Sequence, residues 1–250
     1  MAKPNRRGLG QGLELLWGQV ESGSRGPKPA LTLDEIARAA IDIADRGGLA
    51  SLSMRQVAEQ LGFTTMSLYR YVPNKDELLE IIRDVALGEP PAREPGTSWR
   101  AELSRWARAS LARHHEHPWM LEMEIRRPPF GPNHLRWLDV ALQAIAGLAL
   151  THQDMLSVIL ALDSYVRGAA EVQVGMARER HRLQSSEAEL DRVYARIFET
   201  VATDDRYPAV ARLVHAGVFA QTDGSRDEFE FGLERTLDGI AALVEAKPGR

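Results

Sequence analysis

The sequence of 250 residues contains no cysteine, which excludes disulfide bonds and metal sites built on thiolates. No apolar run approaches the ~20 residues that a membrane-spanning helix requires, and the first residues lack the hydrophobic core of a signal peptide. Aromatic residues make up only 6 %, but a hydrophobic content of 44 % is sufficient for a sizeable core. We therefore expect a globular, cytoplasmic protein of two domains without membrane contact.

Enzyme motifs are also missing. The sequence has no Gly-rich phosphate loop, no Gly-x-Ser-x-Gly elbow and no His-Glu-x-x-His pair. His114, His115 and His117 lie within one helical turn, and two of them could share a face, but no further ligands for a metal ion can be identified. Packing or solvated roles explain these histidines better. We expect no catalytic residue, no metal site and no cofactor.

A surplus of positive charge, common in nucleic-acid-binding proteins, is absent as well. The net charge is −4, and residues 31–88 carry six basic and nine acidic side chains. The distribution matters more than this sum, because residues 62–75 contain Arg70 and Lys75 and no acid. That segment can form a locally positive face, and DNA binding through it should depend strongly on salt.

Residues 53–79 predict two short helices joined by a tight turn and followed at once by a third helix. Ser53 and Gln56 have the spacing of a capping box, which marks a helix start. Gly62 supplies the positive φ that ends a helix, Thr64 can cap the second helix, and Pro73 stops it. The pattern is typical of a helix-turn-helix.

The second of these helices has an unusual outward face. Leu68 and Val72 point inward, which leaves hydroxyls, a methionine, two tyrosines and one arginine outside. Hydroxyl groups and tyrosines can bond phosphates, arginine can pair with guanine, and methionine can meet a thymine methyl group. The alternative is a helical hairpin whose exposed aromatic side chains pack on a neighbouring helix. The face favours DNA reading.

The segment LTLDEIARAAIDIADRGGLASLSMRQVAEQLGFTTMSLYRYVPNKDELLEII resembles the N-terminal domain of TetR-family transcriptional regulators, without a gap over residues 31–85. The resemblance implies that Arg55 and the second helix face the bases or the groove, and that Tyr69 and Lys75 hold phosphates. The predicted DNA-binding residues are Ser53, Arg55, Thr64, Thr65, Met66, Ser67, Tyr69, Arg70, Tyr71 and Lys75.

The rest of the chain divides on either side of this segment. Residues 1–30 form a basic, partly flexible N-terminal arm, in which residues 12–20 can make one or two helical turns. Such an arm either stays a disordered tail or reaches DNA through Arg6, Arg7, Arg25 and Lys28. In relatives with a similar N-terminus, Leu15 to Trp17 would dock on the body. Residues 31–88 form the DNA-binding domain, and a Pro-rich break follows at residues 89–96.

Residues 89–250 show only helical patterns, so the expected fold class is all-α, with a three-helix DNA-binding domain and a larger helical bundle. The segments HPWMLEMEIRRPPFGPN and RDEFEFGLERTLDGIAALV resemble the regulatory domain of the tetracycline-repressor branch. The expected helices cover residues 99–117, 119–126, 134–150, 152–182, 187–203, 208–216 and 227–246.

This second domain is rich in bulky, adaptable side chains with polar groups between them. An ordinary helical core explains each residue singly, but together they favour an apolar cavity with a few orienting polar groups. The resemblance implies that the cavity holds a small effector. The predicted ligand-binding residues are Trp106, Trp119, Met123, Trp137, Met155, Asp163, Tyr165 and Arg167.

The last helix carries an apolar stripe at steps of three and four residues, broad enough to serve both a core and a partner. One DNA-binding domain reads only a few base pairs, so we expect a homodimer on a palindromic operator. The predicted dimer residues are Phe229, Leu233, Leu237, Ile240, Leu243 and Val244.

These observations predict a DNA-binding transcriptional regulator, a repressor that a small-molecule effector releases from double-stranded DNA. The effector must bind the DNA-incompetent state more tightly, since equal affinity for both states would shift nothing. The alternative is a helical ligand-binding or interaction protein without sequence-specific DNA binding.

Overall fold

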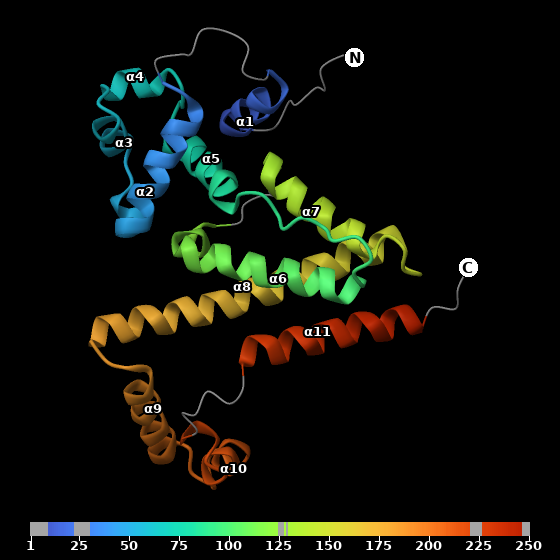
Figure 1. Ribbon diagram of the computed structural model, residues 1–250. Helices are drawn as coiled ribbons and strands as arrows, with labels where there is room; N and C mark the ends of the chain where they lie inside the picture. Colours follow the sequence, from blue (N-terminus) through green and yellow to red (C-terminus); the bar gives the residue numbers. More distant parts are fainter. Residues whose placement is uncertain (1–9, 23–30, 125–127, 129, 221–226, 247–250) are drawn as a thin grey trace.

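The structure is a computed structural model that describes residues 10–22, 31–124, 128, 130–220 and 227–246. All regular structure in these residues is helical, as the sequence predicts (Figure 1). None of the described helices is long and apolar enough to cross a membrane. The elements are α1 (Gln11–Ser22), α2 (Leu33–Ser51), α3 (Met54–Gln60), α4 (Thr65–Tyr69), α5 (Lys75–Leu87), α6 (Trp99–Glu116), η1 (Pro118–Glu122), α7 (Pro132–Ile145), α8 (His152–Leu183), α9 (Glu187–Val201), α10 (Pro208–His215), η2 (Val218–Ala220) and α11 (Glu228–Glu245).

Local sequence signals set the ends of the N-terminal helices. Each of α2 to α5 begins with a side-chain oxygen that accepts a hydrogen bond from a backbone N–H three residues on, and the caps are Thr32, Ser53, Thr64 and Asn74. Gly48 (φ +71°) kinks α2 near its end, and Gly62 (φ +74°) lies in the turn after α3. The capping box predicted at Ser53 and Gln56 forms only in part. Ser53 Oγ donates to the Gln56 side-chain oxygen at 2.9 Å, and the Gln56 side chain does not bond the Ser53 backbone N–H.

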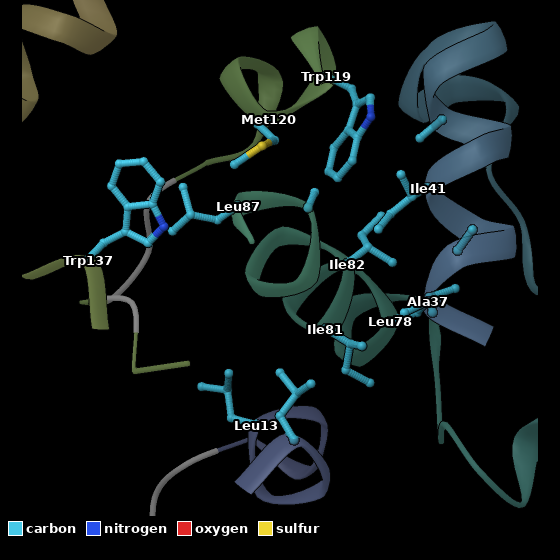
Figure 2. Close-up of a cluster of buried hydrophobic side chains, with 14 of the residues drawn as sticks. Leu13, Ala37, Ile41, Leu78, Ile81, Ile82, Leu87, Trp119, Met120 and Trp137 are labelled. Carbon is cyan, nitrogen blue, oxygen red and sulfur yellow. The ribbon is translucent and has the colours of Figure 1, made fainter. Parts of the chain in front are cut away.

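Helix α5 is the centre of the N-terminal core. Leu78, Ile81 and Ile82 are fully buried along it, and Figure 2 shows Ile41 of α2 and Leu13 of α1 on different sides of this helix. Because α5 also contacts α6 and α7, it connects the N-terminal helices to the rest of the molecule.

Residues 11–22 form a docked helix, where the sequence predicts a partly flexible arm with one or two helical turns. Leu13 and Leu16 are buried against α5, whereas Leu15, one of the residues predicted to dock, is exposed. Trp17 Nε1 donates a hydrogen bond to the Phe130 carbonyl oxygen at 2.9 Å. The helix therefore spans from the N-terminal core to the segment before α7. The four basic residues predicted to reach DNA lie outside the described residues.

Helices α6, α7, α8 and α11 form the second body, in which α8 packs on the other three (Figure 1). The segment predicted as a helix over 119–126 is the short 3-10 helix η1 instead. Helix α7 begins at Pro132, two residues earlier than predicted. Proline fits the first position of a helix, and Asn133 lies inside α7 instead of capping it. The predicted starts of α8, α9 and α11 are confirmed by side-chain caps at Thr151, Ser186 and Asp227.

Helices α9 and α10 form a separate hairpin at the end of the molecule opposite α3 and α4 (Figure 1). They pack on each other through η2, where the rings of Phe198 and Phe219 stack at 4.1 Å. Val193, Ile197 and Val201 on α9 stay exposed in the single protomer. The hairpin thus presents an apolar face beyond the bundle.

Candidate functional site

The first candidate site is the outward face of α4. Leu68 and Val72 are completely buried and fix the orientation of this short helix. Met66 is 75 % exposed, and Tyr69 and Arg70 are exposed beside it. Packing therefore turns α4 so that Met66, Tyr69 and Arg70 project from the protein, whereas the predicted reading residue Tyr71 is half-buried against the core.

Two cationic side chains flank α4. Arg55, on the first turn of α3, has a side chain that is 80 % exposed and pairs with Glu59 at 2.7 Å. Lys75 is the first residue of α5, and its ammonium group donates to the Leu49 carbonyl oxygen of α2 at 3.4 Å. Both charges can turn toward a phosphate without leaving a buried partner unpaired. The ten predicted DNA-binding residues thus lie together, from the start of α3 to the start of α5, at one end of the molecule (Figure 1).

The second candidate site is a polar cluster where α5, α6, α7 and α8 meet. Asp84 of α5 is 1 % exposed and accepts three hydrogen bonds from the start of α7: from the Asn133 and His134 backbone N–H groups at 3.1 and 3.0 Å, and from His134 Nδ1 at 2.9 Å. Since α7 has no cap of its own, Asp84 caps it from another helix.

Other ionisable groups of this cluster come from α5, α6 and α8. His114 Nδ1 donates to the Ser110 carbonyl oxygen at 2.9 Å, and burial lowers the pKa of the imidazole. Burial likewise raises the pKa of Asp163 and lowers that of Arg83. The Arg167 guanidinium donates to the Leu121 carbonyl oxygen at 2.9 Å. Burial is the main cause of all three pKa shifts, and the groups concerned lie on three neighbouring helices of the bundle.

The predicted ligand-binding residues are dispersed around this cluster. Trp106 and Trp137 are buried with their rings edge to face at 5.7 Å, and each indole N–H is bonded to a backbone oxygen. Tyr165 donates to the Phe229 carbonyl oxygen at 2.8 Å in the contact of α8 with α11. Asp163 and Arg167 lie in the polar cluster, whereas Met123 and Met155 are half-buried at the edge of the core. Sequence periodicity did not single out Arg83, Asp84 or His134, because their roles depend on contacts between helices.

Trp119 lies elsewhere, between the two bodies. Asp45 of α2 accepts hydrogen bonds from Trp119 Nε1 at 2.6 Å and from His117 Nδ1 at 2.9 Å. The contact joins the N-terminal helices to the end of α6. Trp119 therefore connects the N-terminal helices to the second body, a role that the sequence did not predict.

The apolar stripe of α11 packs within the protomer. Phe229, Leu233, Leu237 and Ile240 are buried, while Leu243 and Val244 are half-buried. Exposed apolar side chains occur on α8, where Leu160 is 55 % and Val172 is 66 % exposed, as well as on α9. No cluster of His, Asp and Glu among the described residues could hold a metal ion.

Two family models match this chain. The family described as bacterial regulatory proteins, tetR family, matches residues 36–82. The family described as tetracyclin repressor-like, C-terminal domain, matches residues 90–244. The two matches meet at the Pro-rich break between α5 and α6.

Curated proteins and solved structures give matches of the same kind. The chain is 42 % identical over 240 residues to the HTH-type transcriptional repressor DrrR1 of Streptomyces coeruleorubidus, covering 95 % of this chain and 87 % of that one. An HTH-type transcriptional regulator of Saccharopolyspora erythraea is 30 % identical over 231 residues, 92 % of each chain. ActR from Streptomyces coelicolor in complex with actinorhodin has a TM-score of 0.70 at 27 % identity, covering 87 % of this chain and 98 % of that one.

Proposed function

The chain belongs to the TetR family of bacterial transcription regulators, and we propose that it acts in the cytoplasm as a homodimer that leaves a palindromic operator when an effector binds. As a member of this family it is a DNA-binding repressor with a helix-turn-helix, not a member of an enzyme family. We assign residues 31–88 to DNA binding and residues 89–250 to effector binding and dimerisation.

The outward face of α4 carries this proposal. A surface helix without a partner usually carries Glu and Lys, whereas α4 projects Met66, Tyr69 and Arg70 between the cationic Arg55 and Lys75. This set combines side chains that reach base edges with side chains that reach phosphates. The ten predicted DNA-binding residues act together in the proposed complex.

The test begins with selection of genomic fragments that bind the purified full-length protein, followed by a salt titration on the best fragment. We expect a palindromic site and an affinity that falls steeply with salt, because phosphate contacts release counterions. Weak binding to every sequence, lost at moderate salt, would instead support a helical ligand-binding protein without sequence-specific DNA binding.

The effector site is proposed between α5, α6, α7 and α8. The polar cluster lies there, and α5 connects it directly to the DNA-facing end at Lys75. A relative of the same fold, ActR, is solved in complex with actinorhodin, which supports a small-molecule ligand for this chain. We propose that the predicted residues either contact the ligand or transmit the effect of its binding to the DNA-binding domain. They are Trp106, Trp119, Met123, Trp137, Met155, Asp163, Tyr165 and Arg167.

We propose that the dimer forms through the outward face of α8, with Leu243 and Val244 of α11 at its margin. Leu160 and Val172 are exposed on this face, and Gly168 between them has no neighbour within 4 Å of the position that a Cβ would occupy. A second α8 can therefore approach closely.

Replacing Leu160 and Val172 together with aspartate should convert the dimer into a monomer, because two charges would be buried in the contact. Sedimentation should show the loss of the dimer, and operator affinity should fall at least tenfold. The matched control is Leu135→Asp, an exposed leucine on α7. A dimer that persists in the double variant would place the interface elsewhere.

A further inference from the structure

Arg83 is a buried cation that Glu80, Asp163 and Asp84 attract electrostatically but that none of them holds in an ion pair. It lies on α5 with 9 % of its surface exposed, and among the described residues no hydrogen bond and no ion pair within 4.0 Å involves its guanidinium. Among the described residues, Arg105 Nε is the one side-chain nitrogen or oxygen that is both fully enclosed and without a hydrogen bond. The Arg83 nitrogens are unbonded but are not in that class, so they remain in contact with accessible space. A buried guanidinium in this state is costly unless something else supplies oxygen atoms.

Asp163 of α8 is the second unpartnered group. It makes no hydrogen bond or ion pair among the described residues, although more than a third of its surface is accessible. Its electrostatic neighbours come from three other helices: Arg83 of α5, His114 of α6 and His134 of α7. The Asp163 carboxylate therefore lies among charged groups of these three helices.

The remaining groups of the cluster make no hydrogen bond or ion pair with Arg83 or Asp163, and this includes Glu80, which attracts Arg83 from one turn earlier on α5. The Asp84 carboxylate is occupied by the start of α7. Arg167 has N–H groups left beside its bond to Leu121 and adds a second positive charge near Arg83. The cluster thus offers donors at two arginines and an acceptor at Asp163. One turn beyond Arg83, Leu87 belongs to the same cluster of buried hydrophobic side chains as Met120 and Trp137, so apolar side chains border the polar cluster (Figure 2).

We propose that the effector is an organic acid with an apolar ring body, whose anionic oxygens bind the Arg83 guanidinium and whose hydroxyl group donates to Asp163. This inference rests on the proposed effector site and specifies its chemistry. An oxyanion satisfies the guanidinium, and a hydroxyl on the same ligand satisfies the carboxylate. A neutral hydrocarbon would leave both groups unpaired, and a cation would be repelled by the two arginines. Because Arg83 belongs to α5, the bound anion acts directly on the helix that carries Lys75.

The test compares three probes by titration calorimetry on the full-length protein: 6-hydroxy-2-naphthoate, its carboxamide, and 2-naphthoate, which lacks the hydroxyl group. We expect the hydroxy acid to bind at least tenfold tighter than the carboxamide and several-fold tighter than 2-naphthoate. Arg83→Gln should abolish the preference for the acid, and Asp163→Asn should abolish the preference for the hydroxyl group. The control Arg38→Gln removes an exposed arginine of α2 and should change neither. Equal affinities for acid and carboxamide, or no binding of either, would overturn the proposal.

A second measurement does not need a ligand. Arg83→Met keeps an extended side chain but removes the unpaired charge, so the ligand-free variant should melt higher than the parent, by about 2–4 °C. A lower melting temperature would mean that Arg83 has a stabilising partner within the protein, which contradicts the proposed role.

Operator binding separates this proposal from the regulator function. If the parent and Arg83→Gln bind the operator equally and the acid preference is absent, the effector chemistry is wrong and the repressor function stands. If no operator is found but the acid binds through Arg83, the ligand chemistry stands and the regulator function fails.

Discussion

Replacing Asp84 with alanine should lower the free energy of unfolding by about 3–5 kcal/mol, the range for removing one partner of a buried charged network. The carboxylate is 1 % exposed, and two backbone N–H groups and the His134 ring would lose their acceptor. Asp84→Asn keeps the size of the side chain and one carbonyl oxygen, so it should lower the free energy of unfolding by less. Urea unfolding measures the change.

The neighbouring geometry makes this prediction specific. A Cβ on Gly131 would lie 2.0 Å from Asp84 Oδ1, so only glycine allows the carboxylate to approach the start of α7. Gly131→Ala should therefore destabilise the protein through the same contact, and the double variant should cost less than the sum of the two single changes. The matched control is Asp139→Ala, an exposed aspartate on α7. A loss below about 1 kcal/mol for Asp84→Ala would mean that water replaces the carboxylate as the cap.

The ends of the N-terminal helices could be predicted because their signals are local. Thr32, Thr64 and Asn74 each bond a backbone group three residues on, and Gly62 needs only its own φ. The same holds for the starts of α8, α9 and α11. A linear pattern contains the whole of such an interaction, so reading the sequence is sufficient to find it.

Contacts between helices could not be predicted in the same way. Asp84 and His134 are 50 residues apart, and Asp45 and Trp119 are 74 apart, and nothing in the sequence alone pairs them. Periodicity likewise identified the apolar face of α11 but not what covers it, since a stripe packs equally well on its own bundle or on a second copy. In the protomer, Leu233 and Leu237 are completely buried. Arg83 was missed because a charged residue on a helix is usually solvated.

Replacing Tyr69 and Lys75 together with alanine should weaken operator binding at least a hundredfold. Tyr69 at the end of α4 and Lys75 at the start of α5 are both exposed. Neither side chain is buried in the core, so the variant should fold normally. Each phosphate contact that is lost reduces the slope of log affinity against log salt by about 1. A salt titration on the selected operator therefore distinguishes lost phosphate contacts from a damaged protein. The control Arg38→Ala removes an exposed charge from α2 and should leave affinity and slope unchanged.

Arg70→Ala should act differently from the double variant, because Arg70 projects toward base edges in the proposed complex. Its loss should cost about 1–3 kcal/mol on the preferred operator and much less on an operator altered at the base pair that it reads. Binding selections with the parent and the variant, performed on a library of operator sequences, measure this difference. A uniform loss at all sequences would assign Arg70 to the phosphates, and sequence reading would then depend on Met66 and its neighbours on α4. The comparison thus separates the side chains that position the protein from those that choose its site.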